Sequence, residues 1–324
     1  MSRSRLLRSG APNMLALVVA VSALTFVAVN ADPVSSGGGI GSLNAASITN
    51  VSVSLPPAPP MPETLDTAAT SDEATSPAPV ASQHLTGCWA MKLHTEMLQR
   101  GCLQFAQHQD YSATFTKQER IDGYLSDVQE IDLKLRHQNF SVYMKWNSGD
   151  AGRQLIYVNG KNEGNLLVQL GGIKGRLTGV MPLAPEGDLA MAECRYPVTK
   201  AGLIPLAQTI LLHQMSHVEA GAGYRCEMRN GEEFDGRPCY LFVCEYDSPQ
   251  VSPEYRKSII FVDKEWSLPV CVKNFTWATD ASPEKLDDET LIEFYAYTNV
   301  TLNCSFEDQD FDEHNPVYRL RCRK

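Results

Sequence analysis

Residues 131–146 read IDLKLRHQNFSVYMKW, and this stretch decides the fold. Apolar side chains alternate with polar ones through residues 131–136, and after a short polar break the alternation resumes through residues 140–146. A period of two is the pattern of a β-strand with one buried face and one wet face. The stretch therefore predicts two strands whose apolar face is either an ordinary core or the wall of a cavity.

The same kind of patterning extends along the chain on both sides. Apolar residues at helical spacing predict a helix within residues 84–108, and alternation predicts strands over 111–121 and 124–136. Two more strands, 153–158 and 165–170, are separated by NGKNEG, whose Asn-Gly pair suits a hairpin turn. These residues therefore predict a helix followed by a run of antiparallel strands.

A second helix is expected over Lys200–Val218, with Thr199 as its N-cap. Strand patterns then resume at 237–246, 255–266 with a tight turn at Asp263-Lys264, 268–278 and 290–304. Long strands joined by short turns indicate an antiparallel sheet with helices on one face. The predicted fold class is α+β: a curled antiparallel half-barrel sheet with helices packed on its concave face.

The N-terminal part of the chain has the layout of a secretory signal. Three arginines lie within the first eight residues, and an apolar stretch of 16 residues, 14–29, precedes the small residue Ala31. We expect residues 1–31 to be a signal peptide cleaved after Ala31. The alternative is an uncleaved segment that associates with a membrane, although a spanning helix needs about 20 apolar residues.

Residues 32–81 are rich in proline, glycine, serine and threonine and poor in large apolar residues. Such a composition buries too little surface to offset the ordering of the backbone, so a disordered tether is expected. The folded half-barrel domain is expected to span residues 82–324.

The charge of the chain limits its partners. The net charge is −10 for the full chain, and removing the three arginines of residues 1–31 makes it −13. Because an acidic surface repels phosphate backbones, nucleic acid is not expected as a partner. The signal places the protein in the periplasm or cell envelope, where disulfides persist. The nine cysteines are an odd number, and the sequence leaves their pairing open.

No motif in the chain points to catalysis or to a metal. His213 and His217 stand four residues apart on the second predicted helix, but no third ligand is evident, so a polar helix face is expected there. The glycine-rich stretch 171–179 lacks the order of a phosphate-binding loop and is expected to be a mobile loop. The acidic stretch 307–316 lacks the glycine and glutamate of a calcium loop and is expected to be a solvated acidic loop. Neither a catalytic residue nor a cofactor is predicted.

The most prominent chemical feature is the large number of apolar side chains on the predicted strands and helices. If the core is imperfectly packed, these side chains would form a slot for an acyl chain. The predicted ligand-binding residues are Phe115, Ile131, Leu133, Leu135, Phe140, Val142, Met144, Trp146, Trp89 and Leu206.

Several segments of this chain resemble an exported bacterial family of unknown function, the domain family numbered 1571. The segments are YSATFTKQERIDGYLSDVQEIDLKLRHQNFSVYMKW, IYVNGKNEG, YPVTKAGLIPL and FDEHNPVYRL, and the similarity spans about residues 84–322. The order of elements is similar to that of periplasmic lipoprotein carriers and outer-membrane lipoprotein receptors. That resemblance implies a half-barrel whose concave face holds acyl chains beneath helices that act as a lid.

The resemblance also gives parts of the chain a place in such a carrier. It implies that Tyr111–Arg120 is the first strand, that Leu135–Trp146 lies where carriers place apolar and arginine residues, and that Lys200–Leu212 is a covering helix. The nine cysteines, the long tether and the acidity depart from the carriers.

The function predicted first is therefore an exported, non-enzymatic protein that binds an apolar ligand, a lipid or the acyl chain of another protein. Two alternatives stay open. One is a tethered structural or interaction module with a filled core, and the other is a hydrolase whose site is assembled in space.

Overall fold

The structure, a computed structural model, describes residues 84–278 and 282–321. The signal peptide predicted for residues 1–31 and the tether predicted for residues 32–81 lie outside the described residues. The predicted half-barrel domain is the part of the chain to which the following description applies.

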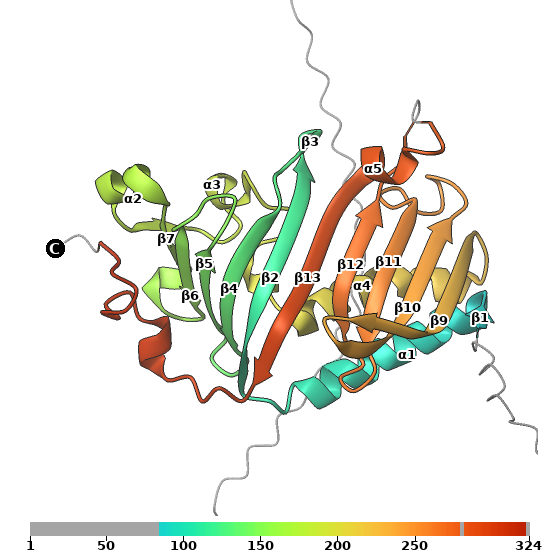
Figure 1. Cartoon of the computed structure of the whole chain (residues 1–324), viewed down its shortest axis with the longest axis horizontal. Coiled ribbons are helices and arrows are strands. Elements are labelled where there is room, and N and C mark those ends of the chain that lie inside the picture. The colour runs from blue at the N-terminus through green and yellow to red at the C-terminus, as the bar shows by residue number, and fades with distance from the viewer. Residues whose placement is uncertain (1–83, 279–281, 322–324) are drawn as a thin grey trace, which may run out of the picture. The chain divides into compact units, whose positions relative to one another are not determined.

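Thirteen strands of the described residues form one antiparallel sheet in the order β1-β9-β10-β11-β12-β13-β2-β4-β5-β6-β7-β8, with the short β3 paired to β2 (Figure 1). The strands are β1 (His84–Thr86), β2 (Asp110–Ile121), β3 (Tyr124–Leu125), β4 (Gln129–Arg136), β5 (Ser141–Trp146), β6 (Gln154–Val158), β7 (Leu166–Gln169), β8 (Met181–Leu183), β9 (Tyr224–Phe234), β10 (Arg237–Tyr246), β11 (Lys257–Asp263), β12 (Pro269–Phe275) and β13 (Leu291–Leu302). β1 and β8 form the two edges, so the sheet is open, as expected for a half-barrel.

The helices connect these strands, and the two long ones cover one face of the sheet. They are α1 (Cys88–Phe105), α2 (Gly172–Thr178), α3 (Asp188–Met191), α4 (Leu203–Ala220) and α5 (Leu286–Thr290), with single 3-10 turns η1 (Asn162–Gly164), η2 (Val198–Lys200) and η3 (Asp308–Phe311). α1 and α4 pack against each other, α1 against β9 and α4 against β12 (Figure 1). The predicted α+β class, with a curled antiparallel sheet and helices on its concave face, is confirmed.

The register of β4 and β5 shows how the opening stretch folds. Ile131 lies opposite Trp146, Leu133 opposite Met144, and Leu135 opposite Val142. All six side chains are buried, so the two apolar rows form one continuous surface, as the alternation predicted. α1 and α4 each add four side chains to the same core cluster: Ala90, Met91, Leu98, Phe105, Leu203, Ala207, Ile210 and Leu211.

The start of α4 differs from the prediction. Thr199 lies in the turn η2, and the N-cap is Gly202, whose φ of 110° is a conformation that favours glycine. Two tyrosines satisfy the first amide groups: Leu203 N donates to the Tyr111 hydroxyl at 3.0 Å, and Gly202 N donates to the Tyr297 hydroxyl at 3.1 Å. The cap therefore comes from the sheet, which a local pattern does not reveal.

Three further expectations were wrong in detail. The stretch 171–179 contains the helix α2 rather than a loop, and the strand expected over 124–136 is divided into β3 and β4. β9 was not predicted, although Asn230-Gly231 within it is a dipeptide typical of hairpin turns. Gly231, with a φ of 93°, instead lies where the β9–β10 register shifts, and the chain turns at Asp235-Gly236.

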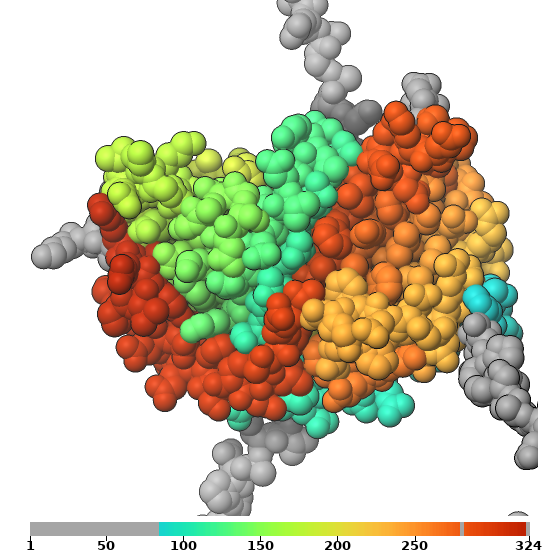
Figure 2. Space-filling model, viewed as in Figure 1, coloured from blue at the N-terminus to red at the C-terminus, as the bar shows by residue number. Residues whose placement is uncertain are grey.

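The C-terminal segment covers part of the opposite, outer face of the sheet (Figure 2). The Tyr318 ring stacks on Tyr143 of β5 with centroids 3.9 Å apart, and Phe311 joins the same small core cluster. The acidic stretch 307–316 is more than a solvated loop. Asp310 and Asp308 pair with Lys134 and Arg136 of β4 at 2.6 and 2.9 Å.

No helix of the described residues has both the length and the apolar content needed to cross a bilayer.

Candidate functional site

A cavity of about 760 Å³ lies between the concave face of the sheet and the chain that covers it. One wall is formed by side chains of β2, β4–β8 and β11–β13. The other wall is formed by α4 and by the segment 183–201, which leads from β8 to α4. Its size falls in the range of about 300–1,000 Å³ that is typical of small-molecule sites.

Aliphatic and aromatic side chains form most of the lining. The apolar sheet wall comprises Phe115, Ile131, Met144, Trp146, Leu155, Leu166, Val168, Leu170, Met181, Leu183, Ile260, Val272, Tyr295 and Tyr297. The covering wall supplies Pro185, Leu189, Ala190, Ala192, Tyr196, Pro197, Val198, Ala201, Leu206, Ile210 and Leu212. Contact of such a surface with an apolar ligand instead of water lowers the free energy of the system.

The structure divides the predicted ligand-binding residues between cavity and core. Those at the cavity are Phe115, Ile131, Met144, Trp146 and Leu206. Leu133, Leu135 and Val142 are at most 1% exposed in the packed core beside it, and Phe140 is partly buried against Tyr157. Trp89 lies on the outer face of α1 with 66% of its surface exposed, so it is far more accessible than the prediction supposed.

The start of α4 is the physical reason for this division. A methyl group added at Gly202 would lie 2.6 Å from Leu135 and 2.8 Å from the Tyr111 hydroxyl, so the backbone here presses directly on the sheet. At this end of β4 the apolar face is filled. Toward Ile131 and Trp146, at the other end of the strand pair, the same face borders the cavity.

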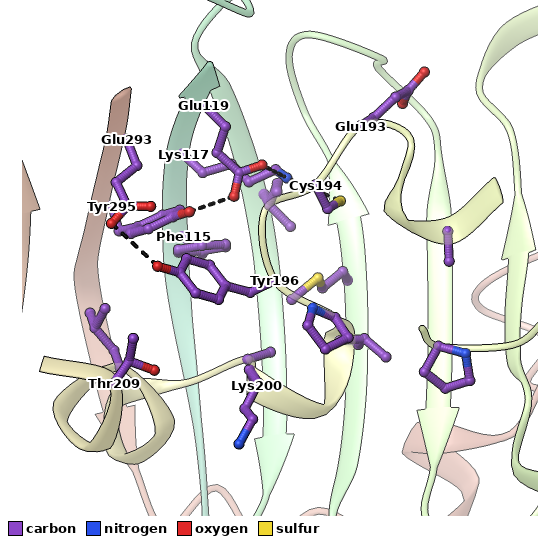
Figure 3. A pocket seen from close by; sticks show the side chains of 18 of the residues that line it. Phe115, Lys117, Glu119, Glu193, Cys194, Tyr196, Lys200, Thr209, Glu293 and Tyr295 are labelled. Carbon is purple, nitrogen blue, oxygen red and sulfur yellow. Dashed lines mark hydrogen bonds and ion pairs between the residues drawn. The ribbon is translucent and has the colours of Figure 1, made fainter. Parts of the chain in front are cut away.

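One end of the cavity is polar (Figure 3). On β2, the Lys117 ammonium donates to Glu119 Oε2 at 2.9 Å and to the Cys194 sulfur at 3.5 Å. The Tyr295 hydroxyl donates a hydrogen bond to Glu119 Oε1 at 2.5 Å. Lys117 and Glu119 are 7% and 4% exposed, so this is a buried ion pair in the cavity wall.

A second ion pair, between the buried Glu293 and the partly buried Arg195, adjoins the first. Glu293 of β13 accepts from Arg195 Nε at 2.6 Å, from Asn274 Nδ2 at 2.6 Å and from the Tyr255 hydroxyl at 3.0 Å. Tyr196 also donates to it, at 3.5 Å. Burial raises the pKa of Glu293, although Arg195 and these donors favour the carboxylate.

The pKa of Lys117 moves in the direction that keeps its charge. Burial opposes the ammonium, but Cys194 and Glu119 outweigh burial and raise the pKa of Lys117. The four groups Lys117, Glu119, Arg195 and Glu293 thus form two compensated pairs. We refer to these four side chains, with Tyr196, Tyr255 and Tyr295, as the polar cluster.

A sequence signal for the polar cluster lies in β2. Tyr111, Ala113 and Phe115 occupy alternate inward positions of β2, and the next two positions in the same phase are Lys117 and Glu119. Charged residues on an otherwise apolar strand face are costly unless they are paired, so they mark a special site. The contribution of residues 183–201 has no comparable signal.

His213 and His217 do not form a solvated polar face. His213 lines the cavity and His217 is buried, and their rings contact Tyr255 and Tyr246 with centroids 4.9 and 4.8 Å apart. Burial, assisted by His217, lowers the pKa of His213 to about 4. Within residues 84–278 and 282–321, no group of three or more His, Cys, Asp or Glu side chains has the geometry to hold a metal ion.

Comparison with known proteins gives a family. Residues 108–320 match the family model described as "Protein of unknown function (DUF1571)". The chain belongs to this family. The resemblance stated from its segments is thereby confirmed, and no curated protein matches the chain.

Several solved structures are similar to this chain. They include the lipoprotein LppX of Mycobacterium tuberculosis (11% identity, 68% of this chain and 99% of that one, TM-score 0.38), a putative outer-membrane lipoprotein-sorting protein domain of Vibrio parahaemolyticus (13%, 71% and 100%, 0.33) and a LolA superfamily protein of Nitrosomonas europaea (10%, 68% and 97%, 0.28). At these levels of similarity the function has to be argued from the cavity itself.

Proposed function

We propose that this member of the DUF1571 family is an exported, non-enzymatic protein that binds an apolar ligand, a lipid or an acyl chain, in the cavity beneath α4. The observation that carries the proposal is the cavity of about 760 Å³, lined mainly by aliphatic and aromatic side chains. The secretory layout of residues 1–31 and the acidic charge support a role in the cell envelope.

The physical chemistry of the lining favours an acyl chain over a polar metabolite. Each methylene group removed from water contributes about 0.8 kcal/mol, so a long chain gains much from such a cavity. A strongly polar ligand would leave most of its hydrogen-bonding groups unpaired against these walls, which is costly. The polar partners are those of the polar cluster together with a few other lining side chains, among them Arg153, Lys200, Thr209, His213 and Gln214.

The test is whether the protein holds lipid and whether the cavity is where it does so. The purified protein should release lipid on organic extraction, detected by mass spectrometry, and should bind a fluorescent long-chain acyl probe. Leu206→Trp, which places an indole at the α4 wall, should weaken probe binding at least tenfold.

Leu103→Trp is the matched control, because Leu103 lies on α1 with 75% of its surface exposed and is not at the cavity. Absence of both co-purifying lipid and probe binding would reject the proposal and favour the tethered structural module. Labelling of a cavity side chain by a hydrolase-directed activity probe would favour the hydrolase instead.

A further inference from the structure

The polar cluster contains two positive and two negative groups. Lys117 pairs with Glu119 at 2.9 Å, and Arg195 pairs with Glu293 at 2.6 Å. Arg195 also pairs with Glu254, whose side chain is half exposed. Neither cation is left uncompensated, and Glu254 shifts the balance of the cluster toward negative charge.

The positive charge of Lys117 is compensated by Glu119, but its ammonium can still donate a further hydrogen bond. An ammonium has three N–H donors, and those of Lys117 go to one carboxylate oxygen and to the Cys194 sulfur at 3.5 Å. Sulfur is a weak acceptor, and Lys117 lines the cavity, so a better acceptor on a ligand could replace it. The cluster therefore suits a ligand group that accepts a hydrogen bond and has no charge.

We propose, building on the proposed function, that the cavity selects acyl chains whose carbonyl is an ester or an amide over free fatty acids. A fatty acid carboxylate at this position would be an additional anion beside Glu119 and Glu293, whose counter-charges are already paired. Lys200 also lines the cavity, but its ammonium points away from the polar cluster (Figure 3). A like charge in a shared site raises the pKa of a carboxylic acid by a unit or more, and each unit is a tenfold change in equilibrium. An ester carbonyl accepts a hydrogen bond from the Lys117 ammonium without that penalty.

The wild-type protein provides the first test. Binding of monopalmitoylglycerol and of palmitate, both below their critical micelle concentrations, is measured at pH 8 by displacement of the fluorescent acyl probe. We expect the ester to bind at least tenfold more tightly. Equal affinity, or tighter binding of palmitate, would overturn the inference.

Glu119→Gln tests whether the polar cluster sets the preference. The substitution removes one negative charge, and the glutamine oxygen can still accept from Tyr295. Palmitate should bind about tenfold more tightly to this variant than to the wild type, since one fewer anion opposes it. The ester-to-acid affinity ratio should therefore fall in this variant.

Glu163→Gln is the matched control, because Glu163 is exposed in η1 and is not at the cavity. It removes the same charge and should leave both affinities unchanged. An ester-to-acid ratio that stays the same in Glu119→Gln would overturn the assignment to the cluster. If Glu119→Gln does not fold, as judged by thermal melting, the wild-type comparison decides alone. Failure of both ligands to bind the wild type would instead reject the proposed function, a result distinct from a reversed preference.

Discussion

At the scale of single residues, the burial of charge distinguishes this domain from a plain apolar half-barrel. Lys117 and Glu119 occupy inward positions of β2 that a purely structural sheet would fill with aliphatic side chains. Removing such charges from water costs several kcal/mol per ion in real proteins, and the pairing recovers only part of that cost. The proposed acyl ligand gives a reason for their presence in the cavity wall.

Removal of one partner of this pair should strongly destabilise the fold. Lys117→Met leaves Glu119 buried without its cation, and breaking a buried pair in this way costs about 3–5 kcal/mol. The matched control is Lys134→Met, which breaks a pair with Asp310 whose side chains are about 30% exposed and should cost at most about 1 kcal/mol. Urea denaturation at pH 7 measures both, and equal costs would contradict the burial argument.

Acid should destabilise the protein through His94, which is fully buried with no hydrogen-bond partner for either ring nitrogen within the described residues. Burial lowers the pKa of His94 from 6.5 to about 4. Because the folded-state pKa is below the unfolded one, the unfolded state binds the proton first, and stability falls as the pH drops from 6.5 toward 4. His94 alone accounts for about 3 kcal/mol over that window.

His94→Phe should remove this part of the acid sensitivity, because a phenyl ring can keep the stacking on Phe242, whose ring centroid is 4.2 Å away. The measurement is the free energy of unfolding at pH 8 and pH 4.5 in both proteins. A difference between wild type and variant that does not depend on pH would show that His94 does not titrate in this way.

At the scale of elements, the close approach of α1 to the β11–β12 turn depends on one glycine. A Cβ atom at Gly101 would lie 2.2 Å from the Ser267 carbonyl oxygen, which belongs to the backbone and cannot rotate away. Gly101 thus sets how closely α1 packs on the sheet.

Gly101→Ala is predicted to lower stability despite the better helix propensity of alanine. The propensity gain is about 1 kcal/mol, whereas overpacking against a fixed backbone costs about 1–3 kcal/mol or more. A net loss of about 2 kcal/mol in the free energy of unfolding is expected. Leu103→Ala, two residues along and 75% exposed, should change it by less than about 0.5 kcal/mol. Stabilisation by Gly101→Ala would mean that α1 sits farther from the turn.

The β9–β10 hairpin brings together two cysteines whose pairing could not be predicted from the sequence. Cys226 and Cys244 lie opposite each other in the register, their sulfurs are 3.1 Å apart, and both are buried. Refolding in a glutathione redox buffer should join them. The two thiols give two electrons and two protons to oxidised glutathione, which is reduced to two glutathione thiols.

The predicted bridge closes a loop of about 18 residues and should add about 3 kcal/mol to stability. Non-reducing peptide mapping identifies it, and Cys244→Ser should abolish both the linked peptide and the added stability. Cys239, buried on the same strand, should stay alkylatable after unfolding. A linkage between Cys226 and any other cysteine would contradict the pairing.

At the scale of the whole molecule, the sheet is packed differently on its two faces. On the outer face the C-terminal segment fills the surface of β4–β6 with Phe311 and Tyr318, whereas the concave face keeps a cavity under α4. The cavity exists only in the folded state. Because unfolding destroys this site, a ligand that binds there stabilises the folded protein.

An ester-linked acyl ligand should therefore raise the melting temperature in a concentration-dependent way. At about 100 times its dissociation constant a ligand stabilises by about 2.7 kcal/mol, or about 5–10 °C for a domain of this size. Differential scanning fluorimetry with monopalmitoylglycerol measures the shift, and Leu206→Trp should reduce it. A shift of equal size in Leu206→Trp would place the ligand elsewhere.

The sequence by itself determined most of the strands, the two long helices, their order and the antiparallel α+β class. These features follow from local periodicity: the alternation in residues 131–146 is visible without any knowledge of neighbours, and the register of β4 and β5 bears it out. The same alternation placed Ile131, Met144 and Trp146 on the concave side, where they line the cavity.

The tertiary structure alone decided which part of that apolar face is filled and which is hollow. Gly202 presses on Leu135 and Tyr111 from a distant part of the chain, whereas Leu206 and the segment 183–201 stand away from Ile131 and Trp146. The pairing of Arg195 with Glu293 likewise joins residues far apart in sequence. Periodicity records the side of a strand on which a residue lies, but packing density depends on what the rest of the chain brings to that side.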